Sequence, residues 1–471
     1  MSRSHLALGL LFLAASTGLL AAEQEQPIGG EARQSIDQVD SASGVQSEAF
    51  DASELWAMTF TNTVLTIDLL RSLPPNENVF FSPMGVSELL SMALEGAGGE
   101  TRNRMLEFLE KRWAKQGVNL QAGLDPAQLG RMMHRAVEDL AGSDSLAFKV
   151  GNSIWSLPPL KPGFSQTVEH SFNADLVEVD PTFPAMKPEI LEWISRQTNG
   201  KGVFPSELLA EPLLRILMIN TLYLNAPWES PFSVDATTNR PFHRLDGSIV
   251  QAPMMLQTMH ARYGRWMEWE LLELPYLGRE VSACFLLPSA PGDVRDAESA
   301  ERAIKAGALA EVEQSLHVWS LCDNFSNLSP VFVDVVIPRF SIDSKVRVDT
   351  ILKSLGLTQP FDHGADFSRM TSERDIALGP ILQNAAIDLN EKGTEAVAVT
   401  AGAMFATGMQ SNEPWFEIRL DHPFLFFLRD NATGTILFAG RVVDPLVGLK
   451  PPPERSQPEG QLDLRIQGNS D

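Results

Sequence analysis

The sequence lacks the short motifs on which most enzymes depend. It contains no G-x-S-x-G nucleophile elbow, no H-E-x-x-H zinc motif, no glycine-rich phosphate loop and no C-x-x-C pair. Its 8 histidines are scattered, and His317, His363 and His422 have no neighbours at metal-ligand spacing. We interpret them as satisfied surface or core residues. We therefore expect no enzymatic activity, no bound metal and no cofactor.

Cysteine and positive charge are also scarce. Cys284 and Cys322 are too few for a disulfide scaffold. Cys284 lies in the apolar run VSACFLLP, which favours a buried free thiol, and a single bridge to Cys322 is the alternative. The net charge of −23 argues against a nucleic-acid partner and against an anionic membrane surface. We expect a soluble monomer with a self-repelling surface.

Long apolar runs are missing except at the N-terminus. Residues 1–22 carry Arg3 and then LALGLLFLAASTGLLAA, the pattern of a secretory signal peptide. Ala21 and Ala22 suit a cleavage site, whereas Leu20 departs from the A-x-A pattern. No other run is long enough to span a bilayer. We expect a secreted, extracellular product, or a periplasmic one if the source is a Gram-negative bacterium.

Polar segments flank one long globular stretch. Residues 23–51 predict a flexible leader and residues 447–471 predict a disordered tail, because both lack periodic apolar residues. The stretch 52–446 has no linker rich in Pro or Ser. Within it, Ser82-Pro83 predicts the start of a helix. Helical patterns dominate the first part and strand patterns the later part, which predicts an α+β fold rather than a βαβ repeat.

One helical section carries a cluster of basic residues. Arg131, His134 and Arg135 could contact a polyanion, but Glu138 and Asp139 follow them closely. This mixture of charges favours a solvated helix face.

The segment from Glu391 to Phe424 has an unusual composition: EKGTEAVAVTAGAMFATGMQSNEPWFEIRLDHPF. Its first half is too small in side-chain volume for a core strand and too regular for a surface loop. At period two, one face is formed by Thr394, Ala396, Ala398, Thr400 and Gly402, and the other by Glu395, Val397 and Val399. We interpret this half as a loop that can become a strand.

The chain resembles the serpin family of serine protease inhibitors along nearly all of 52–446. The segments that carry the resemblance occur in the family's order: NVFFSP at 78–83, EGAGGETRNRMLEFL at 95–109, GNSIW at 151–155, INTLYLNAPWESPF at 219–232, ELPYLGREVSACFLLP at 273–288, IPRF at 337–340, LKSLGL at 352–357, IDLNEKGTEAVAVT at 387–400 and HPFLFFLRDNATGTILFAGRVVDP at 422–445. The resemblance implies three β-sheets, about eight or nine helices and an exposed reactive-centre loop.

The resemblance also implies a mechanism. The target protease cleaves the loop and forms an acyl-enzyme, and the N-terminal half of the loop then inserts into the central sheet as an extra strand. A charge on the buried face of that strand would oppose insertion. The implied hinge comprises Glu391, Lys392, Gly393, Thr394, Glu395, Ala396, Val397, Ala398, Val399 and Thr400. Its small, uncharged face favours an inhibitor. The alternative is a non-inhibitory family member that acts as a carrier, chaperone or storage protein.

The position of the scissile bond follows from the same resemblance. Thr407 is 17 residues from Glu391 counted inclusively, the family's usual distance, which makes Thr407–Gly408 the implied bond. The loop is longer than in many relatives, so the alternatives are Met409–Gln410 and Phe405–Ala406. No Arg or Lys lies between Gly393 and Ile418, which disfavours a trypsin-like partner. We expect an elastase-, subtilisin- or chymotrypsin-like serine protease, with a cysteine protease as the alternative.

Four positions are implied to control opening of the central sheet: Ser82, Asn220, Trp228 and Gln383. Gly85 stands where the family usually has a second serine, and Gln383 where many members have a histidine. We expect Ser82, Asn220 and Gln383 to form one polar cluster, because a buried amide must find partners. Since an amide cannot change its charge as histidine does, position 383 should give sheet opening no transition near neutral pH.

Overall fold

The computed structural model describes residues 52–116, 126–180, 182–200, 204, 206–211, 213–266, 269–288, 308–394 and 415–450. All of them belong to one compact unit of the chain, Phe50–Asp471. The expected signal peptide and leader lie outside the described residues. Of the expected tail, residues 447–450 are described, and the backbone N–H of Lys450 donates to Ser341 Oγ at 3.2 Å.

The helices fall mostly in the first half, as the sequence patterns predict. The described residues form nine α-helices: α2 (Ala52–Ser72), α3 (Pro83–Gly96), α4 (Gly99–Lys115), α5 (Pro126–Ala141), α6 (Pro162–Phe172), α7 (Lys187–Gln197), α9 (Ala308–Ser315), α10 (Val318–Ser326) and α11 (Val348–Ser354). Helix α3 begins as expected, because the side chain of Ser82 accepts from Gly85 N and Pro83 occupies the first turn.

The strands are joined by hydrogen bonds into two sheets. The six-stranded sheet has the order β10 (Phe340–Arg347), β11 (Leu382–Asn390), β12 (Gly393–Thr394), β4 (Ile216–Pro227), β2 (Ala147–Ser156) and β3 (Ala174–Glu178). The nine-stranded sheet has the order β1 (Val79–Phe81), β15 (Ile436–Val442), β14 (Phe424–Asp430), β8 (Val281–Pro288), β7 (Trp269–Pro275), β6 (Ile249–Arg265), β9 (Ser329–Pro338) and β13 (Trp415–Arg419), with β5 (Thr238–His243) paired to β6.

The long strand β6 explains why two hydrogen-bonded sheets stand where three were expected. Its first part pairs with β5 and β9, whereas Arg262–Arg265 pair with β7. One 17-residue strand therefore runs through two of the expected sheets and makes them continuous.

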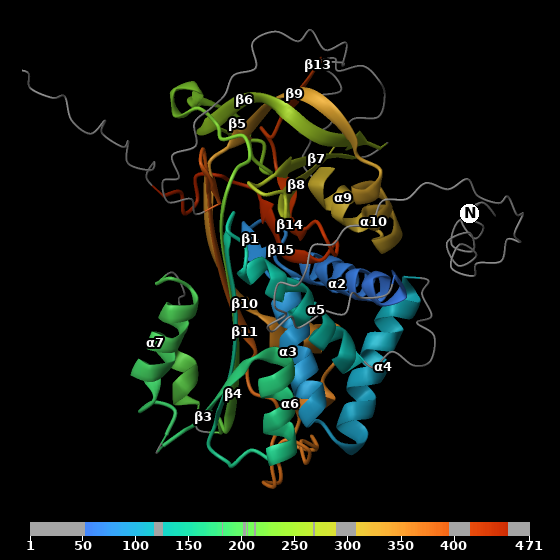
Figure 1. Cartoon of the computed structure of the whole chain (residues 1–471), viewed down its shortest axis with the longest axis vertical. Helices are drawn as coiled ribbons and strands as arrows, with labels where there is room; N and C mark the ends of the chain where they lie inside the picture. Colours follow the sequence, from blue (N-terminus) through green and yellow to red (C-terminus); the bar gives the residue numbers. More distant parts are fainter. Residues whose placement is uncertain are drawn as a thin grey trace, which may run out of the picture. The chain divides into compact units, whose positions relative to one another are not determined.

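The helices cover both faces of the six-stranded sheet. Helices α3, α5 and α6 lie on one face and α7 on the other (Figure 1). Every residue of α3 except Glu95 is buried. Any polar group on α3 must therefore find its partner inside the protein. On β8, Cys284 is buried and free, as expected, and burial raises the pKa of its thiol; Cys322 is also free.

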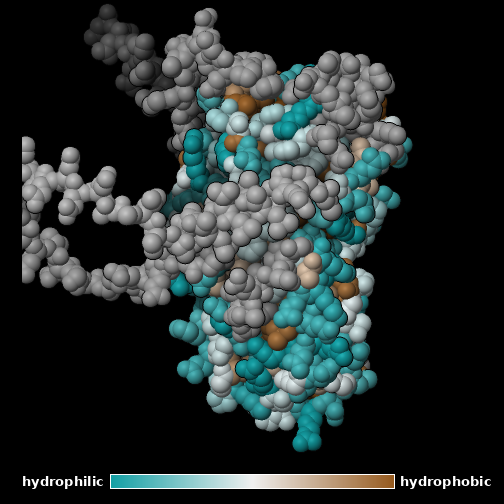
Figure 2. Space-filling model, turned by 90° about the vertical axis from the view of Figure 1, so that its right-hand side faces the viewer, coloured by the Kyte–Doolittle hydropathy of each residue, from teal (hydrophilic) through white to brown (hydrophobic). Residues whose placement is uncertain are grey.

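The described surface shown in Figure 2 is mostly hydrophilic, with isolated hydrophobic spots. Large exposed hydrophobic side chains are scattered along the described residues and include Trp56, Leu213, Ile249 and Val447. Single apolar side chains of this kind are normal on a soluble domain. None of the described helices is long and apolar enough to cross a membrane.

A buried ion pair ties β15 to the helical layer and gives a test of the fold. Arg441 is 1% exposed and donates to both carboxylate oxygens of Glu313, at 2.6 and 2.9 Å, and to the carbonyl oxygens of Leu70 and Pro74.

Arg441→Met leaves the carboxylate of Glu313 buried without this partner. We expect a loss of about 3–5 kcal/mol in the free energy of unfolding, measured as a fall in Tm. Arg104→Met, which removes exposed pairs with Glu100 and Glu107, is the control and should change Tm little. Equal shifts would contradict the prediction.

Candidate functional site

The expected hinge begins inside the six-stranded sheet. Gly393 and Thr394 form β12, which lies between β11 and β4. Gly393 is opposite Asn390 and Pro227, and Thr394 is opposite Leu389 and Ala226. Among the described strands, no ladder pairs β11 directly with β4. We call this boundary between β11 and β4 the seam. Of the described residues, Gly393 and Thr394 pair with both of its sides.

The backbone at Gly393 can be occupied only by glycine. Its φ is 145°, a conformation that residues with a side chain rarely adopt. A Cβ atom at this position would lie 2.2 Å from the carbonyl oxygen of Ala226 and 2.7 Å from Cα of Pro227. The glycine expected to give the hinge its freedom also lets the backbone approach β4 closely.

Thr394 is held by an aromatic pair at the end of the seam. It is 2% exposed, and its hydroxyl lies 2.5 Å from the hydroxyl of Tyr276. Burial raises the pKa of Tyr276 well above its usual range, so the phenol stays neutral. The ring of Tyr276 stacks on Trp228, with centroids 4.5 Å apart. Trp228 in turn donates its backbone N–H to Lys392 O and its indole N–H to Asn390 O. Trp228 therefore contacts the hinge.

Glu391 anchors the start of the hinge with its charge buried. The residue is 1% exposed, and its carboxylate accepts from the hydroxyl of Thr237 at 2.8 Å. Nε of Arg339 lies 3.5 Å from the other carboxylate oxygen, an ion pair rather than a hydrogen bond. The carbonyl oxygen of Glu391 accepts from Phe232 N at 2.9 Å. A buried carboxylate requires such partners, so the chain before Gly393 is fixed.

Ser82 and Gln383 form a reciprocal pair on the β11 side of the seam. The backbone N–H of Ser82 donates to Gln383 Oε1 at 2.7 Å, and Gln383 Nε2 donates to Ser82 O at 2.8 Å. The hydroxyl of Ser82 donates to Leu437 O at 2.6 Å. These bonds tie β11 to the start of α3, and all of the groups are neutral.

Asn220 belongs to a second group on the β4 side of the seam. Its Nδ2 donates to Glu88 Oε2 and to Asn152 Oδ1, both at 2.9 Å. Asn152 Nδ2 also donates to Glu88 Oε2, at 3.1 Å. The expectation of a single cluster with Ser82 and Gln383 is therefore wrong. Gly85 explains the division, since it has no hydroxyl that could bridge the two groups, and a Cβ there would lie 2.0 Å from Asn220 Oδ1.

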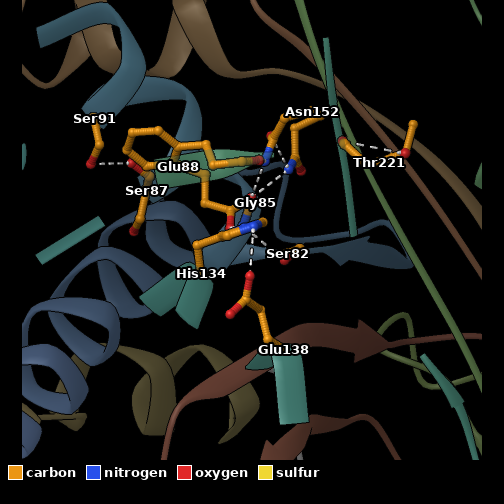
Figure 3. A network of polar contacts seen from close by, with 12 residues as sticks. Ser82, Gly85, Ser87, Glu88, Ser91, His134, Glu138, Asn152 and Thr221 are labelled. Carbon is orange, nitrogen blue, oxygen red and sulfur yellow. Dashed lines mark hydrogen bonds and ion pairs between the residues drawn. The ribbon is translucent and has the colours of Figure 1, made fainter. Parts of the chain in front are cut away.

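His134 completes the second group, and the expectation of a solvated helix face is wrong for this residue. It is 7% exposed, and its Nδ1 lies 2.7 Å from Oε1 of Glu88, which is 0% exposed (Figure 3). Arg131 pairs with Glu95 and Arg135 is exposed, so the expectation holds only for part of the helix. One signal could have found the pair: Glu88 is a charged residue in the middle of a helical pattern that is mostly apolar, and a buried charge requires a partner.

The remaining expected site residues lie outside the described residues. They are Glu395, Ala396, Val397, Ala398, Val399 and Thr400 of the hinge, the expected bond Thr407–Gly408, and the alternatives Phe405, Ala406, Met409 and Gln410. The next described strand, β13, pairs in parallel with β9.

The comparison with protein families agrees with this geometry. A family model described as Serpin (serine protease inhibitor) matches residues 60–445. The chain belongs to the serpin family. Members of this family act on target proteases and are mostly inhibitors rather than catalysts. Protease inhibition in general is therefore the function that membership supports.

Individual serpins resemble this chain over most of their length. Iripin-1 from Ixodes ricinus is 32% identical over 399 residues, which cover 82% of this chain and 94% of that protein. Leukocyte elastase inhibitor from Xenopus tropicalis is 28% identical over 398 residues, covering 81% and 98%. A crystal structure of human thyroxine-binding globulin, 24% identical, matches with a TM-score of 0.68 over 83% of this chain and 99% of that one. These likenesses confirm the α+β serpin fold.

The close approach at Gly393 gives a test of the hinge. We expect Gly393→Ala to displace β12 from the seam, because its Cβ would overlap the backbone of β4. The two bonds of Trp228 to the hinge would be disturbed with it, so tryptophan fluorescence should change and Tm should fall. Gly364→Ala is the matched control, since a Cβ there meets no atom within 4 Å. An unchanged spectrum and Tm in Gly393→Ala would show that β12 is not needed at the seam.

Proposed function

We propose that this protein is an exported inhibitor of serine proteases that acts as a suicide substrate. The protease attacks the reactive-centre loop, the peptide bond breaks, and the serine oxygen keeps the N-terminal part of the loop as an ester. Residues that follow Thr394 then enter the seam and carry the acylated protease with them. The single observation that carries this proposal is the position of β12, which already pairs with β11 on one side and β4 on the other.

The seam would provide an inserting strand with main-chain hydrogen-bonding partners on both sides. Neighbouring strands in a sheet lie about 4.7–4.9 Å apart, and the facing edges of β11 and β4 share no ladder among the described strands. A strand between them would therefore gain main-chain pairing on both sides. Thr394 points to the buried face, and alternation along a strand places Ala396, Ala398 and Thr400 on that same face. Small, uncharged side chains of this kind fit beneath the sheet at little cost.

The loop composition supports a target that does not require a basic residue. No Arg or Lys occurs between Gly393 and Ile418, and Thr407, Met409 and Phe405 suit elastase-, subtilisin- or chymotrypsin-like enzymes. One of the relatives is named as an inhibitor of leukocyte elastase, which agrees with this class. Residues 1–22 have the composition of a signal peptide, which supports export.

A panel of proteases tests the proposal directly. The purified protein would be incubated with elastase, subtilisin, chymotrypsin, trypsin and papain, and complexes that survive denaturant would be detected by gel electrophoresis. We expect stable complexes with one or more of the first three, and sequencing of the released C-terminal fragment would identify the bond. Complexes with trypsin alone would contradict the proposed class. Cleavage without any complex and without a rise in Tm would favour the non-inhibitory alternative.

A charge at Thr394 tests the insertion step separately from recognition. Thr394→Arg places a cation on the buried face, where desolvation costs several kcal/mol. The variant should still be cleaved, but the protease should escape, so the moles of variant consumed per mole of protease inhibited should rise about tenfold or more. Glu395→Arg is the matched control, since alternation places that residue on the other face. Equal effects of the two substitutions would contradict insertion with this register.

A further inference from the structure

Helix α3 lies behind the seam and is bonded to the strands on both sides of it. On one side, the backbone of Ser82 exchanges two hydrogen bonds with Gln383 of β11. On the other side, Glu88 accepts from Asn220 of β4 and Asn152 of β2. A strand that enters between β11 and β4 separates them by one further strand spacing, about 4.7–4.9 Å. Hydrogen bonds do not survive a shift of that size, so at least one of the two attachments must break.

Only the attachment on the β4 side contains charge. The carboxylate of Glu88 has no exposed surface, and it accepts from both asparagine amides on one oxygen and contacts His134 through the other (Figure 3). A buried carboxylate is costly without a counter-charge. His134 is the group that can supply one, because it lies 2.7 Å away on α5.

We propose that Glu88 and His134 form a titratable latch that positions β4 against α3 and controls how readily the seam opens. This role rests on the proposed inhibitory function, because the seam must open for the loop to enter. Glu88 and His134 are positioning residues: they would not contact the protease or the scissile bond.

The charged groups around His134 determine whether its pKa is raised or lowered. Burial of the ring lowers the pKa of His134, but the hydrogen bond and negative charge of Glu88, with a further contribution from Glu138, outweigh burial and raise the pKa above its usual range. The exposed carboxylate of Glu138 lies 4.0 Å from Nε2. The other residues of charged or titratable type on α5 and on the helices and strand packed against it are, by sequence, Glu54, Asp68, Arg71, Glu95, Arg131, Arg135, Asp139, Lys149, Glu169 and His170.

The sign of the pH dependence follows from that raised pKa. A histidine with a raised pKa in the folded state contributes its full stability below its unfolded pKa, about 6.5. That stability is lost as the pH rises through the higher folded-state pKa. The latch is therefore closed at the acidic end of the range and weakened at the alkaline end, so the seam should open more readily above neutral pH.

Two readouts across pH 6 to 9 test the latch. The first is Tm at a fixed scan rate. The second is the rate at which a synthetic peptide with the sequence of residues 394–407 anneals into the intact protein, followed by native gel electrophoresis. In the wild-type protein, Tm should fall with rising pH and annealing should become about tenfold faster, the effect expected for loss of one charge-assisted hydrogen bond. In His134→Gln, both quantities should be nearly independent of pH.

Further variants separate a titratable role from a structural one. Glu88→Gln should also abolish the pH dependence, and it stands in if His134→Gln does not fold. Gln383→Ala loosens the neutral attachment on β11, so it should speed annealing equally at all pH values, and Glu138→Gln should keep most of the wild-type dependence. If His134→Gln lowers Tm but keeps the wild-type slope against pH, the latch is disproved. If no peptide anneals at any pH, the proposed inhibitory function fails, and the slopes of Tm in wild-type protein, His134→Gln and Glu88→Gln still decide whether the pair titrates.

Discussion

In the part of the chain that the structure describes, the six-stranded sheet is joined across its middle by two residues. Gly393 and Thr394 bridge β11 and β4, and no direct ladder joins these strands elsewhere along their described length. Main-chain pairing, the usual source of cohesion in a sheet, is therefore nearly missing at the seam. The surrounding side chains take its place. Trp228 and Tyr276 hold β12 from one end, and α3 holds both strands from behind.

These side-chain contacts differ from a ladder of main-chain hydrogen bonds in one physical respect. A ladder is a row of similar bonds, whereas the seam is held by a few polar groups whose burial is costly unless every partner is present. Glu391 and Glu88 are both buried carboxylates with specific partners. Such contacts favour one arrangement of the strands, because each buried polar group is stable only with its own partners. The facing edges of β11 and β4 share no ladder among the described strands, so the sheet has main-chain pairing to gain if the insertion proposed above takes place.

The sequence predicted the features that depend on residues close together in the chain. The start of α3 at Ser82-Pro83 and the α+β class follow from short-range patterns, whereas the roles assigned to the hinge and to Trp228 come from motifs of the family and stay predictions. The contacts that hold the seam join residues that are far apart in the sequence. Tyr276 and Thr394 are separated by 118 positions, and Glu88 and His134 by 46. The charged neighbours of His134 gave its helix the appearance of a solvated face. Only packing decides which side of such a helix turns inward.

Gly85 shows how these contacts constrain change in the sequence. The amide of Asn220 occupies the space that a side chain at position 85 would need, and in this orientation its Nδ2 donates to Glu88. A serine at 85 would force Asn220 to rotate and would remove a donor from a buried carboxylate. The residue at position 85 is therefore coupled to Asn220 and, through the hydrogen bond of Asn220, to the buried carboxylate of Glu88. A serine at position 85 would therefore require a compensating change at position 220, so we expect these two positions to vary together.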